Sequence, residues 1–204
     1  MVMNSSQAAW ALLVVAAILP FAHGGSGDSV LDVLGRPVVT GTEYTILPVN
    51  GGGLRLKWRN NSCPLNVVYN DNQESLPVIF TPYIYVKVIT EDADLKVEFS
   101  AVTVCAQSTR WRLRRDSELE KTLIYAGNSS SSASSSFPFD LAYFRIIKSE
   151  GDDGNVYELS FCPHVCSTCK IACGSLGIYT DEDGNQWLVK ESDINPLKVQ
   201  FKRA

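Results

Sequence analysis

The stretch Phe161–Asp181, FCPHVCSTCKIACGSLGIYTD, holds four of the six cysteines of this 204-residue chain. These are Cys162, Cys166, Cys169 and Cys173, spaced C-x3-C-x2-C-x3-C. Four thiols within twelve residues must share a compact turn, so they either cross-link that turn or bind a metal ion. The redox state of the compartment decides between these two outcomes.

The N-terminal residues favour an oxidising compartment. Residues 1–24 contain no Lys, Arg, Asp or Glu, and the almost unbroken apolar run 8–21 is followed by Ala22-His23-Gly24. This pattern is typical of a cleaved secretory signal peptide, and the run is shorter than the about 20 residues that a membrane-spanning helix needs. We therefore expect a signal peptide at 1–24. The mature chain, residues 25–204, is expected to be one secreted (extracellular) or vacuolar domain without a membrane anchor.

Six cysteines in such a compartment favour three disulfides. Zinc is the alternative for the cluster, but it normally needs a reducing setting and histidine ligands, and only His164 follows the signal. The C-x-x-C of Cys166 and Cys169 lacks the βαβ context of a redox motif. We expect no metal and no cofactor. Cys63 and Cys105 are left over and are expected to pair, although the spacing alone allows many connectivities.

Composition and motifs exclude several other functions. The formal net charge of −4 argues against binding to nucleic acid or anionic membrane, and the one basic cluster, Arg110–Arg115, alternates like a solvated strand face. With two histidines and no Gly-x-Ser-x-Gly, nothing supports an enzyme. The acids Asp152-Asp153 and Asp181-Glu182-Asp183 lie in turn sequences, where solvated loops explain them better than calcium or glycosidase chemistry.

Apolar residues alternate with polar ones at a period of two nearly everywhere, which predicts short strands separated by Gly, Asn and Asp turns and no amphipathic helix. The predicted strands are Tyr44–Pro48, Leu54–Trp58, Asn66–Tyr69, Pro77–Phe80, Tyr85–Ile89, Leu95–Val102, Trp111–Arg115, Thr122–Tyr125, Phe139–Ile147, Val156–Phe161, Gly177–Tyr179, Gln186–Val189 and Leu197–Phe201. About a dozen strands at such spacing predict an all-β barrel or sandwich. A weak threefold regularity, with divisions near Tyr83 and Phe137, suggests a trefoil.

Two loops carry N-glycosylation sequons. Asn60 opens Asn-Asn-Ser, and Asn128 opens Asn-Ser-Ser within a Ser-rich tract that extends to Ser136 and is expected to be a loop. In a secreted chain both asparagines are candidate glycan acceptors. Asn128 is the better candidate, because Asn60 lies close to Cys63.

Four motifs are distributed along the mature chain. They are Val30-Leu-Asp-x-x-Gly-Arg-Pro-Val38 with Tyr44-x-Ile46, Ser62-Cys-Pro-Leu65, Phe161-Cys-Pro-x-x-Cys-x-x-Cys-Lys-x-x-Cys-Gly174, and Gly177-Ile-Tyr-x-Asp181. Together they resemble the plant Kunitz-type (soybean trypsin inhibitor) family, and the doubled C-terminal cysteine cluster is similar to its miraculin-like branch. The resemblance implies a β-trefoil of about twelve short strands and protease inhibition as the parent activity. It also implies the disulfides Cys63–Cys105, Cys162–Cys173 and Cys166–Cys169.

In this family the loop that enters a protease lies between the fourth and fifth strands, within the segment spanned by the first disulfide. Here that loop is Thr81-Pro82-Tyr83-Ile84-Tyr85-Val86-Lys87. Counting forward from Pro82-Tyr83 places the primary specificity residue at Ile84, whereas counting back from Phe99 places it at Tyr85. The sequence leaves both assignments open.

Neither Ile84 nor Tyr85 is basic, so we predict no strong trypsin inhibition. The primary pocket of trypsin holds a buried aspartate, and leaving such a charge unpaired costs about 2–5 kcal/mol. Lys87 would change this only if the loop is shifted by two or three residues from this register. Tyr or Ile instead suits the apolar pockets of chymotrypsin-, elastase- or subtilisin-like serine proteases. The competing interpretation is that residues 83–86 begin a strand and pack into the fold.

Family inhibitors brace this loop with an asparagine from the N-terminal segment, and the motif around Asp32 aligns Thr40 with it. Threonine has one hydroxyl donor where asparagine has two amide donors and an acceptor, so we expect a weaker brace.

The sequence leaves two functions open. One is an inhibitor of apolar-specific serine proteases, and the other is a miraculin-like defence, binding or storage protein without inhibition. An exposed loop favours the first. We expect a monomer, although the sequence leaves the oligomeric state open: with all six cysteines paired, none remains to show an interchain bridge.

Overall fold

The computed structural model describes residues 27–105, 108–128, 142–166 and 168–204, so the expected signal peptide and most of the Ser-rich tract lie outside it. Every regular element in these ranges is a strand. The described residues contain no helix that is long and apolar enough to cross a membrane. The strands are β1 (Glu43–Pro48), β2 (Gly53–Arg59), β3 (Ser62–Asn70), β4 (Pro77–Pro82), β5 (Leu95–Phe99), β6 (Trp111–Asp116), β7 (Lys121–Ala126), β8 (Arg145–Lys148), β9 (Tyr157–Phe161), β10 (Gly174–Thr180), β11 (Gln186–Glu191) and β12 (Lys198–Arg203).

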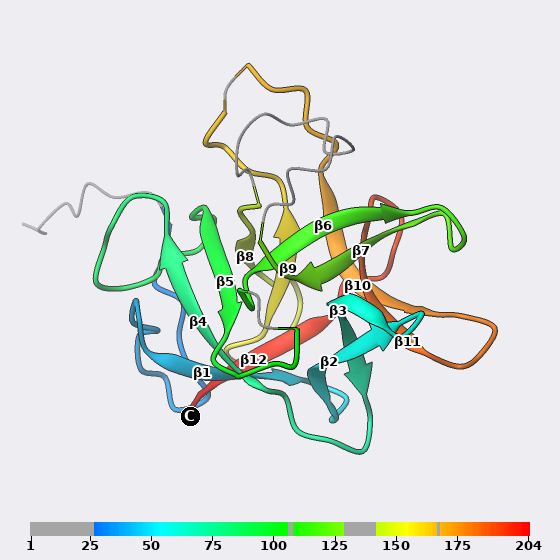
Figure 1. The fold of residues 1–204 in the computed structure, drawn as a ribbon. Helices are drawn as coiled ribbons and strands as arrows, with labels where there is room; N and C mark the ends of the chain where they lie inside the picture. The colour runs from blue at the N-terminus through cyan, green and yellow to red at the C-terminus, as the bar shows by residue number, and fades with distance from the viewer. Residues whose placement is uncertain (1–26, 106–107, 129–141, 167) are drawn as a thin grey trace, which may run out of the picture.

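Strands β1, β4, β5, β8, β9 and β12 close into a barrel (Figure 1). All neighbours are antiparallel: β1 pairs with β4 and β12, β4 with β5, and β9 with β8 and β12. The ring closes between β5 and β8 at a bridge of Leu95 with Phe144, whose backbones exchange hydrogen bonds of 2.8 and 2.7 Å. A closed ring leaves no unpaired edge between these strands.

The other six strands form the hairpins β2–β3, β6–β7 and β10–β11, which pair with one another through β3, β7 and β11. Three hairpins on a six-stranded barrel make a β-trefoil, as the sequence predicts. The hairpins meet around a small apolar cluster of Val68, Leu123, Trp187 and Val189. The contribution of one residue from β3 and one from β7, with two from β11, reflects the threefold regularity of the chain.

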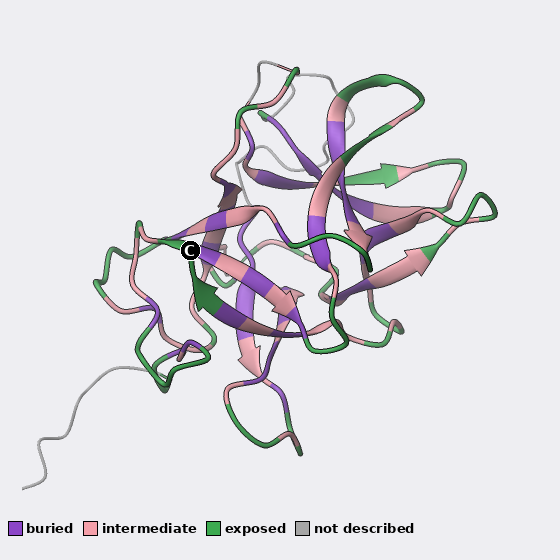
Figure 2. Ribbon diagram, turned by 90° about the horizontal axis from the view of Figure 1, so that it is seen from below, coloured by how far each residue is buried: buried purple, intermediate pink, exposed green. Residues whose placement is uncertain are grey.

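The main core fills the barrel. Alternate residues point inward along each strand, as in β5, where Leu95, Val97 and Phe99 are at most 1% exposed. In Figure 2 the buried positions follow the strands, and the exposed ones gather in the connecting loops. Burial of each large apolar side chain contributes about 1.5–3 kcal/mol before the entropy of ordering is counted.

Three of the predicted strands need correction. The run Tyr85–Ile89 is not a strand: residues 83–87 are exposed, and only an isolated bridge of Val88 with Val39 follows. Strand β5 ends at Phe99 rather than Val102, and β8 begins at Arg145, well after Phe139, which lies outside the described residues. Alternation of apolar residues marks an extended chain, but it does not show whether that chain is paired or exposed.

The prediction that the basic cluster on β6 forms a solvated strand face is only partly correct. Arg114 and Arg115 are exposed, but Arg112 is 8% exposed and therefore buried. The guanidinium of Arg114 lies 5.3 Å from the ring centroid of Tyr125 on β7. The face is thus solvated at one end and covered at the other.

The three disulfides are those that the family resemblance implies. Cys63–Cys105 links β3 to the connection between β5 and β6, and Cys162–Cys173 and Cys166–Cys169 cross-link the connection between β9 and β10. No cysteine is free.

Two aspartates of the sequence motifs, Asp32 and Asp181, stabilise the turns in which they lie by accepting hydrogen bonds from residues close by in the chain. Both oxygens of Asp32 are used: Oδ1 accepts the backbone N–H groups of Leu34 and Arg36 at 2.9 Å, and Oδ2 pairs with the Arg36 guanidinium. Burial by itself raises the pKa of Asp32, but the hydrogen bonds from Arg36 and Leu34 outweigh burial and hold the pKa below its usual value. Asp181 likewise accepts from Asn185 and from the Trp187 indole at 2.7 Å, which gives this acid a structural role.

Candidate functional site

The connection after β4 projects from the barrel. Pro82 ends the strand and is buried, whereas the next four side chains are solvent-exposed: Tyr83 59%, Ile84 74%, Tyr85 80% and Val86 39%. Lys87 is exposed as well. These values contradict the interpretation that residues 83–86 pack into the trefoil.

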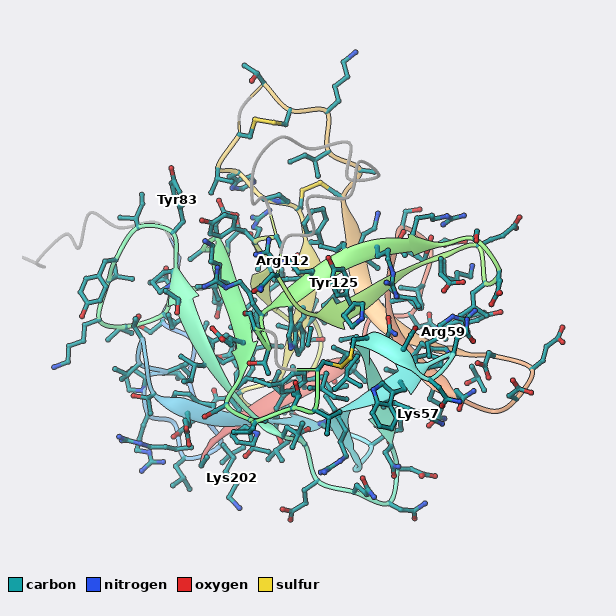
Figure 3. All side chains as sticks on the ribbon, in the orientation of Figure 1. Lys57, Arg59, Tyr83, Arg112, Tyr125 and Lys202 are labelled. Atoms are coloured by element: carbon teal, nitrogen blue, oxygen red, sulfur yellow. A yellow bond between two sulfur atoms is a disulfide. The ribbon has the colours of Figure 1, made fainter. Side chains whose placement is uncertain are left out.

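The first half of this loop is held at Tyr83. Its backbone N–H donates to the carbonyl oxygen of Asp94 at 2.8 Å, and its ring meets Tyr143 edge to face at 5.4 Å between centroids. Figure 3 shows Tyr83 at the tip of β4. Lys96 lies on β5 beside the loop, and its ammonium is 5.0 Å from the ring centroid of Tyr143. Tyr83 is therefore exposed but anchored.

The second half is held by the N-terminal segment. The Thr40 hydroxyl donates to the carbonyl oxygen of Val86 at 2.5 Å, and the Thr40 backbone N–H donates to that of Lys87 at 3.0 Å. Two residues further on, the backbone N–H of Ile89 donates to the carbonyl oxygen of Val38 at 2.8 Å. Lys87 thus lies at the base of the loop, and its backbone is paired.

Ile84 and Tyr85 form the tip between these anchors. Within the described residues, no hydrogen bond involves the backbone or side chain of either one. The tip combines two large, exposed side chains and free backbone groups with fixed ends on both sides. This arrangement presents a short peptide in a defined conformation.

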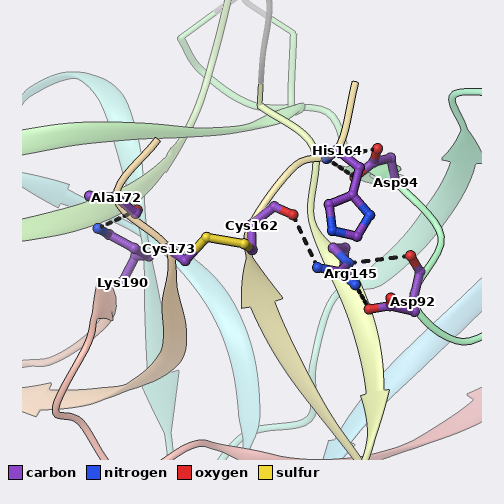
Figure 4. Close-up of a disulfide and its surroundings, with 8 residues drawn as sticks. All are labelled: Asp92, Asp94, Arg145, Cys162, His164, Ala172, Cys173 and Lys190. Carbon is purple, nitrogen blue, oxygen red and sulfur yellow. Dashed lines mark hydrogen bonds and ion pairs between the residues drawn. A yellow bond between two sulfur atoms is a disulfide. The ribbon is translucent and has the colours of Figure 1, made fainter. Parts of the chain in front are cut away.

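The loop is linked to the disulfide cluster through Asp94 (Figure 4). Both carboxylate oxygens of Asp94 lie 3.0 Å from the backbone nitrogen of His164, in the connection between β9 and β10. The carbonyl of Asp94 accepts from Tyr83, so one residue contacts both segments. No local sequence pattern predicts the contact between Asp94 and His164, because these residues are 70 positions apart in the chain.

Arg145 supports the same region from the barrel. Its guanidinium donates to the carbonyl oxygens of Asp92 and Cys162, each at 3.2 Å, and forms an ion pair with the Asp92 carboxylate. The Arg145 side chain is 10% exposed, and burial lowers its pKa from the ordinary arginine value. Sequence reasoning missed this residue, because its partners are distant in the chain.

The two candidate glycosylation sites are placed as follows. Asn60 is exposed in the turn between β2 and β3, with a φ of 56°. Asn128 is exposed after β7, and the two serines that complete its sequon lie outside the described residues.

Comparison with known proteins gives the family. The sequence profile of the legume Kunitz family, described as trypsin and protease inhibitor, matches residues 30–203. The chain belongs to this Kunitz family. The match includes the projecting loop, both of its anchoring segments and all six cysteines.

Kunitz proteins of differing specificity are similar to this chain. Kunitz type trypsin inhibitor 104 of Medicago truncatula is 32% identical (94% of this chain, 92% of the relative). Miraculin of Synsepalum dulcificum is 34% identical (94% and 91%). Subtilisin inhibitor CLSI-II of Canavalia lineata is 32% identical (87% and 93%).

A solved Kunitz complex shows how a relative engages a protease. The soybean trypsin inhibitor bound to porcine pancreatic trypsin superposes with a TM-score of 0.69 at 27% identity. The match covers 87% of this chain and 99% of the matched chain. Kunitz relatives therefore bind serine proteases, and this is an inhibitor family rather than an enzyme family.

Proposed function

We propose that this Kunitz protein is a secreted inhibitor that presents residues 81–87 to serine proteases with an apolar primary pocket. The observation that carries the proposal is the exposure of Ile84 and Tyr85, at 74% and 80%, on a loop anchored at both ends. A monomer in solution, N-glycans on Asn60 and Asn128, and secretory or vacuolar targeting by residues 1–24 belong to the same proposal.

The mechanism is substrate-like docking. Either Ile84 or Tyr85 enters the primary pocket, and the free backbone groups at the tip pair with the protease. Because Tyr83 and Val86 are held by Asp94 and Thr40, less conformational freedom is lost on binding than with a flexible peptide. The anchors also keep the two ends of the loop together if the protease cleaves it.

Selectivity follows from the side chains at the tip. Neither candidate offers a positive charge to the aspartate in the trypsin pocket, which costs about 2–5 kcal/mol, or roughly thirtyfold to several thousandfold in affinity. Lys87 supplies no substitute, because its backbone is paired with Thr40 at the base of the loop. The subtilisin inhibitor among the relatives supports an apolar-specific target.

A second candidate function is a miraculin-like protein without protease inhibition. The observation that favours it is the single side-chain hydrogen bond from Thr40, to the Val86 carbonyl, where an asparagine has two donors and an acceptor to offer. A loop that is braced less firmly than in other family members binds proteases less tightly.

The two functions separate in a titration. Oxidised protein lacking residues 1–24 is titrated against chymotrypsin, elastase, subtilisin, trypsin and papain. The proposal predicts tight inhibition of at least one of the first three, with trypsin weaker by thirtyfold or more and papain unaffected. Absence of inhibition of all five by a sample with a cooperative thermal transition would reject the inhibitor and favour the miraculin-like function.

A further inference from the structure

A pair of aromatic rings connects the first half of the exposed loop to the barrel. The rings of Tyr83 and Tyr143 lie edge to face, with 5.4 Å between their centroids and 86° between their planes. Tyr83 is 59% exposed, whereas Tyr143, which precedes β8, is 8% exposed. In this arrangement the positive edge of one ring meets the negative face of the other. The contact therefore joins an exposed side chain to a buried one in a preferred geometry.

Tyr143 is held in place by its neighbour in the chain. The backbone of Phe144 exchanges two hydrogen bonds with Leu95, at 2.8 and 2.7 Å, where the barrel closes. The ring of Phe144 is 1% exposed and packs against Trp111 in the core. Successive side chains of an extended chain point to opposite faces, so Tyr143 points away from the core. Its backbone cannot shift without opening the barrel.

A cation lies over the Tyr143 ring. The ammonium of Lys96 is 5.0 Å from the ring centroid, a distance at which the π electrons of the ring attract a positive charge. Lys96 is opposite Thr81, the first residue of the loop, in the β4–β5 ladder. Tyr143 is thus held from the strand that pairs with the start of the loop.

Tyr83 is attached to the barrel at two different points. Its backbone N–H donates to the carbonyl oxygen of Asp94 at 2.8 Å, and its ring packs against Tyr143. A single hydrogen bond would let the residue rotate about the line from nitrogen to oxygen, and the second contact, at the ring, prevents this rotation. Because Ile84 follows directly, the orientation of Tyr83 sets the direction in which the tip of the loop leaves the barrel.

We propose that Tyr143 is a positioning residue that orients the 81–87 loop for protease binding through Tyr83. Its side chain is 8% exposed, so it acts through Tyr83 and not by direct contact with the protease. Orientation of the loop before binding lowers the conformational freedom that is lost in the complex. The effect on inhibition rests on the function proposed above, whereas the effect on the order of the loop does not.

The test compares two replacements of Tyr143. Tyr143→Leu keeps an apolar side chain and removes the ring, and it should raise the inhibition constant about two- to tenfold. The protease is whichever of chymotrypsin, elastase and subtilisin the wild type inhibits most tightly. Tyr143→Phe should match the wild type, because the ring contact does not use the hydroxyl. The matched control is Tyr125→Leu on β7, since Tyr125 is also 8% exposed and lies 5.3 Å from a cation, Arg114.

A double variant shows whether Tyr143 acts through Tyr83. In the background of Tyr83→Ala, the further change Tyr143→Leu should not alter the inhibition constant, because the contact between the two rings is already absent. A role of Tyr143 in general stability would instead lower inhibition in both backgrounds. Denaturant unfolding of every variant measures that general loss separately.

Amide hydrogen exchange tests the same contact without a protease. In Tyr143→Leu the N–H of Tyr83 should exchange about two- to tenfold faster than in the wild type. The N–H of Thr40, which donates to Lys87 in the second half of the loop, should keep its rate. If the wild type inhibits no protease and the Tyr83 amide still responds in this way, the proposed function fails while the orientation of the loop by Tyr143 is supported.

Three results would overturn the proposal. They are an unchanged exchange rate of the Tyr83 amide in Tyr143→Leu, an equal loss of inhibition in Tyr143→Phe and Tyr143→Leu, and an undiminished effect of Tyr143→Leu when Tyr83 is already alanine.

Discussion

The hydroxyl of Thr40 donates a hydrogen bond to the carbonyl oxygen of Val86, across 46 residues of sequence. This contact fixes the second half of the exposed loop to the N-terminal segment, while Asp94 fixes the first half at Tyr83. The conformation of the loop is thus imposed by segments that are distant in the chain.

Removal of the Thr40 hydroxyl should weaken inhibition with little effect on global stability. Thr40→Val keeps the β-branched shape and removes one hydrogen bond, for which about 0.5–1.5 kcal/mol is typical. The inhibition constant for a chymotrypsin-like target should rise about two- to tenfold. The control is Thr180→Val, at an exposed position at the end of β10. An unchanged inhibition constant for Thr40→Val would show that the hydroxyl does not support the loop.

Replacement of Arg145 should destabilise the fold. Arg145→Met leaves the carbonyl oxygens of Asp92 and Cys162 without their donor and the Asp92 carboxylate without its partner. We expect a loss of about 2–3 kcal/mol, less than for a fully buried ion pair, because Asp92 is half exposed. Guanidinium unfolding with the disulfides intact measures the loss. Arg203→Met, at an exposed position, should change stability by no more than about 0.5 kcal/mol; equal losses in both variants would refute the role of Arg145.

The disulfides should differ in their contributions according to the length of chain that they close. Cys63–Cys105 spans 42 residues, Cys162–Cys173 spans 11, and Cys166–Cys169 spans 3. The chain-entropy relation gives about 4, 3 and 2 kcal/mol. Paired Cys→Ala variants, compared by denaturant unfolding, should follow this order. A larger loss from the Cys166–Cys169 pair than from the Cys63–Cys105 pair would contradict the expectation.

Asp32 should make stability depend on pH in the acid range. Its pKa in the folded protein lies below the unfolded value of about 3.9. Its stabilising contribution is therefore fully present above that value and is lost as the pH falls through the folded pKa. Asp32→Asn should lower the melting temperature at pH 7, and the difference from the wild type should shrink between pH 4 and pH 2. The exposed Asp71→Asn serves as control, and a difference independent of pH would exclude this linkage.

The sequence predicts the fold well because alternation is a local signal of extended chain. Strands such as β5, with Leu95, Val97 and Phe99 inward, carry their burial in their own residues. The same signal misleads at Tyr85–Ile89, where an extended but exposed loop also alternates. The closure of the barrel between Leu95 and Phe144 has no local signature at all.

The candidate site, like the fold, is predicted only in part by the sequence. The loop residues Thr81–Lys87 follow from the motifs, but their exposure does not, because a half-buried strand shows the same pattern. The supporting contacts of Asp94 with His164 and of Arg145 with Asp92 join residues 70 and 53 positions apart. Such pairs depend on the three-dimensional arrangement of the barrel, so one sequence by itself gives no sign of them.

The central claim is that the tip of the 81–87 loop enters a protease pocket, and a change of specificity tests it most directly. Ile84→Arg and Tyr85→Arg each place a guanidinium at the tip, and Val49→Arg is the control away from the loop. The account predicts that one of the two tip variants gains trypsin affinity by roughly thirtyfold or more over the wild type, which also identifies the primary residue. If both variants fold and neither gains affinity for trypsin beyond the control, the loop does not act as a substrate-like inhibitor.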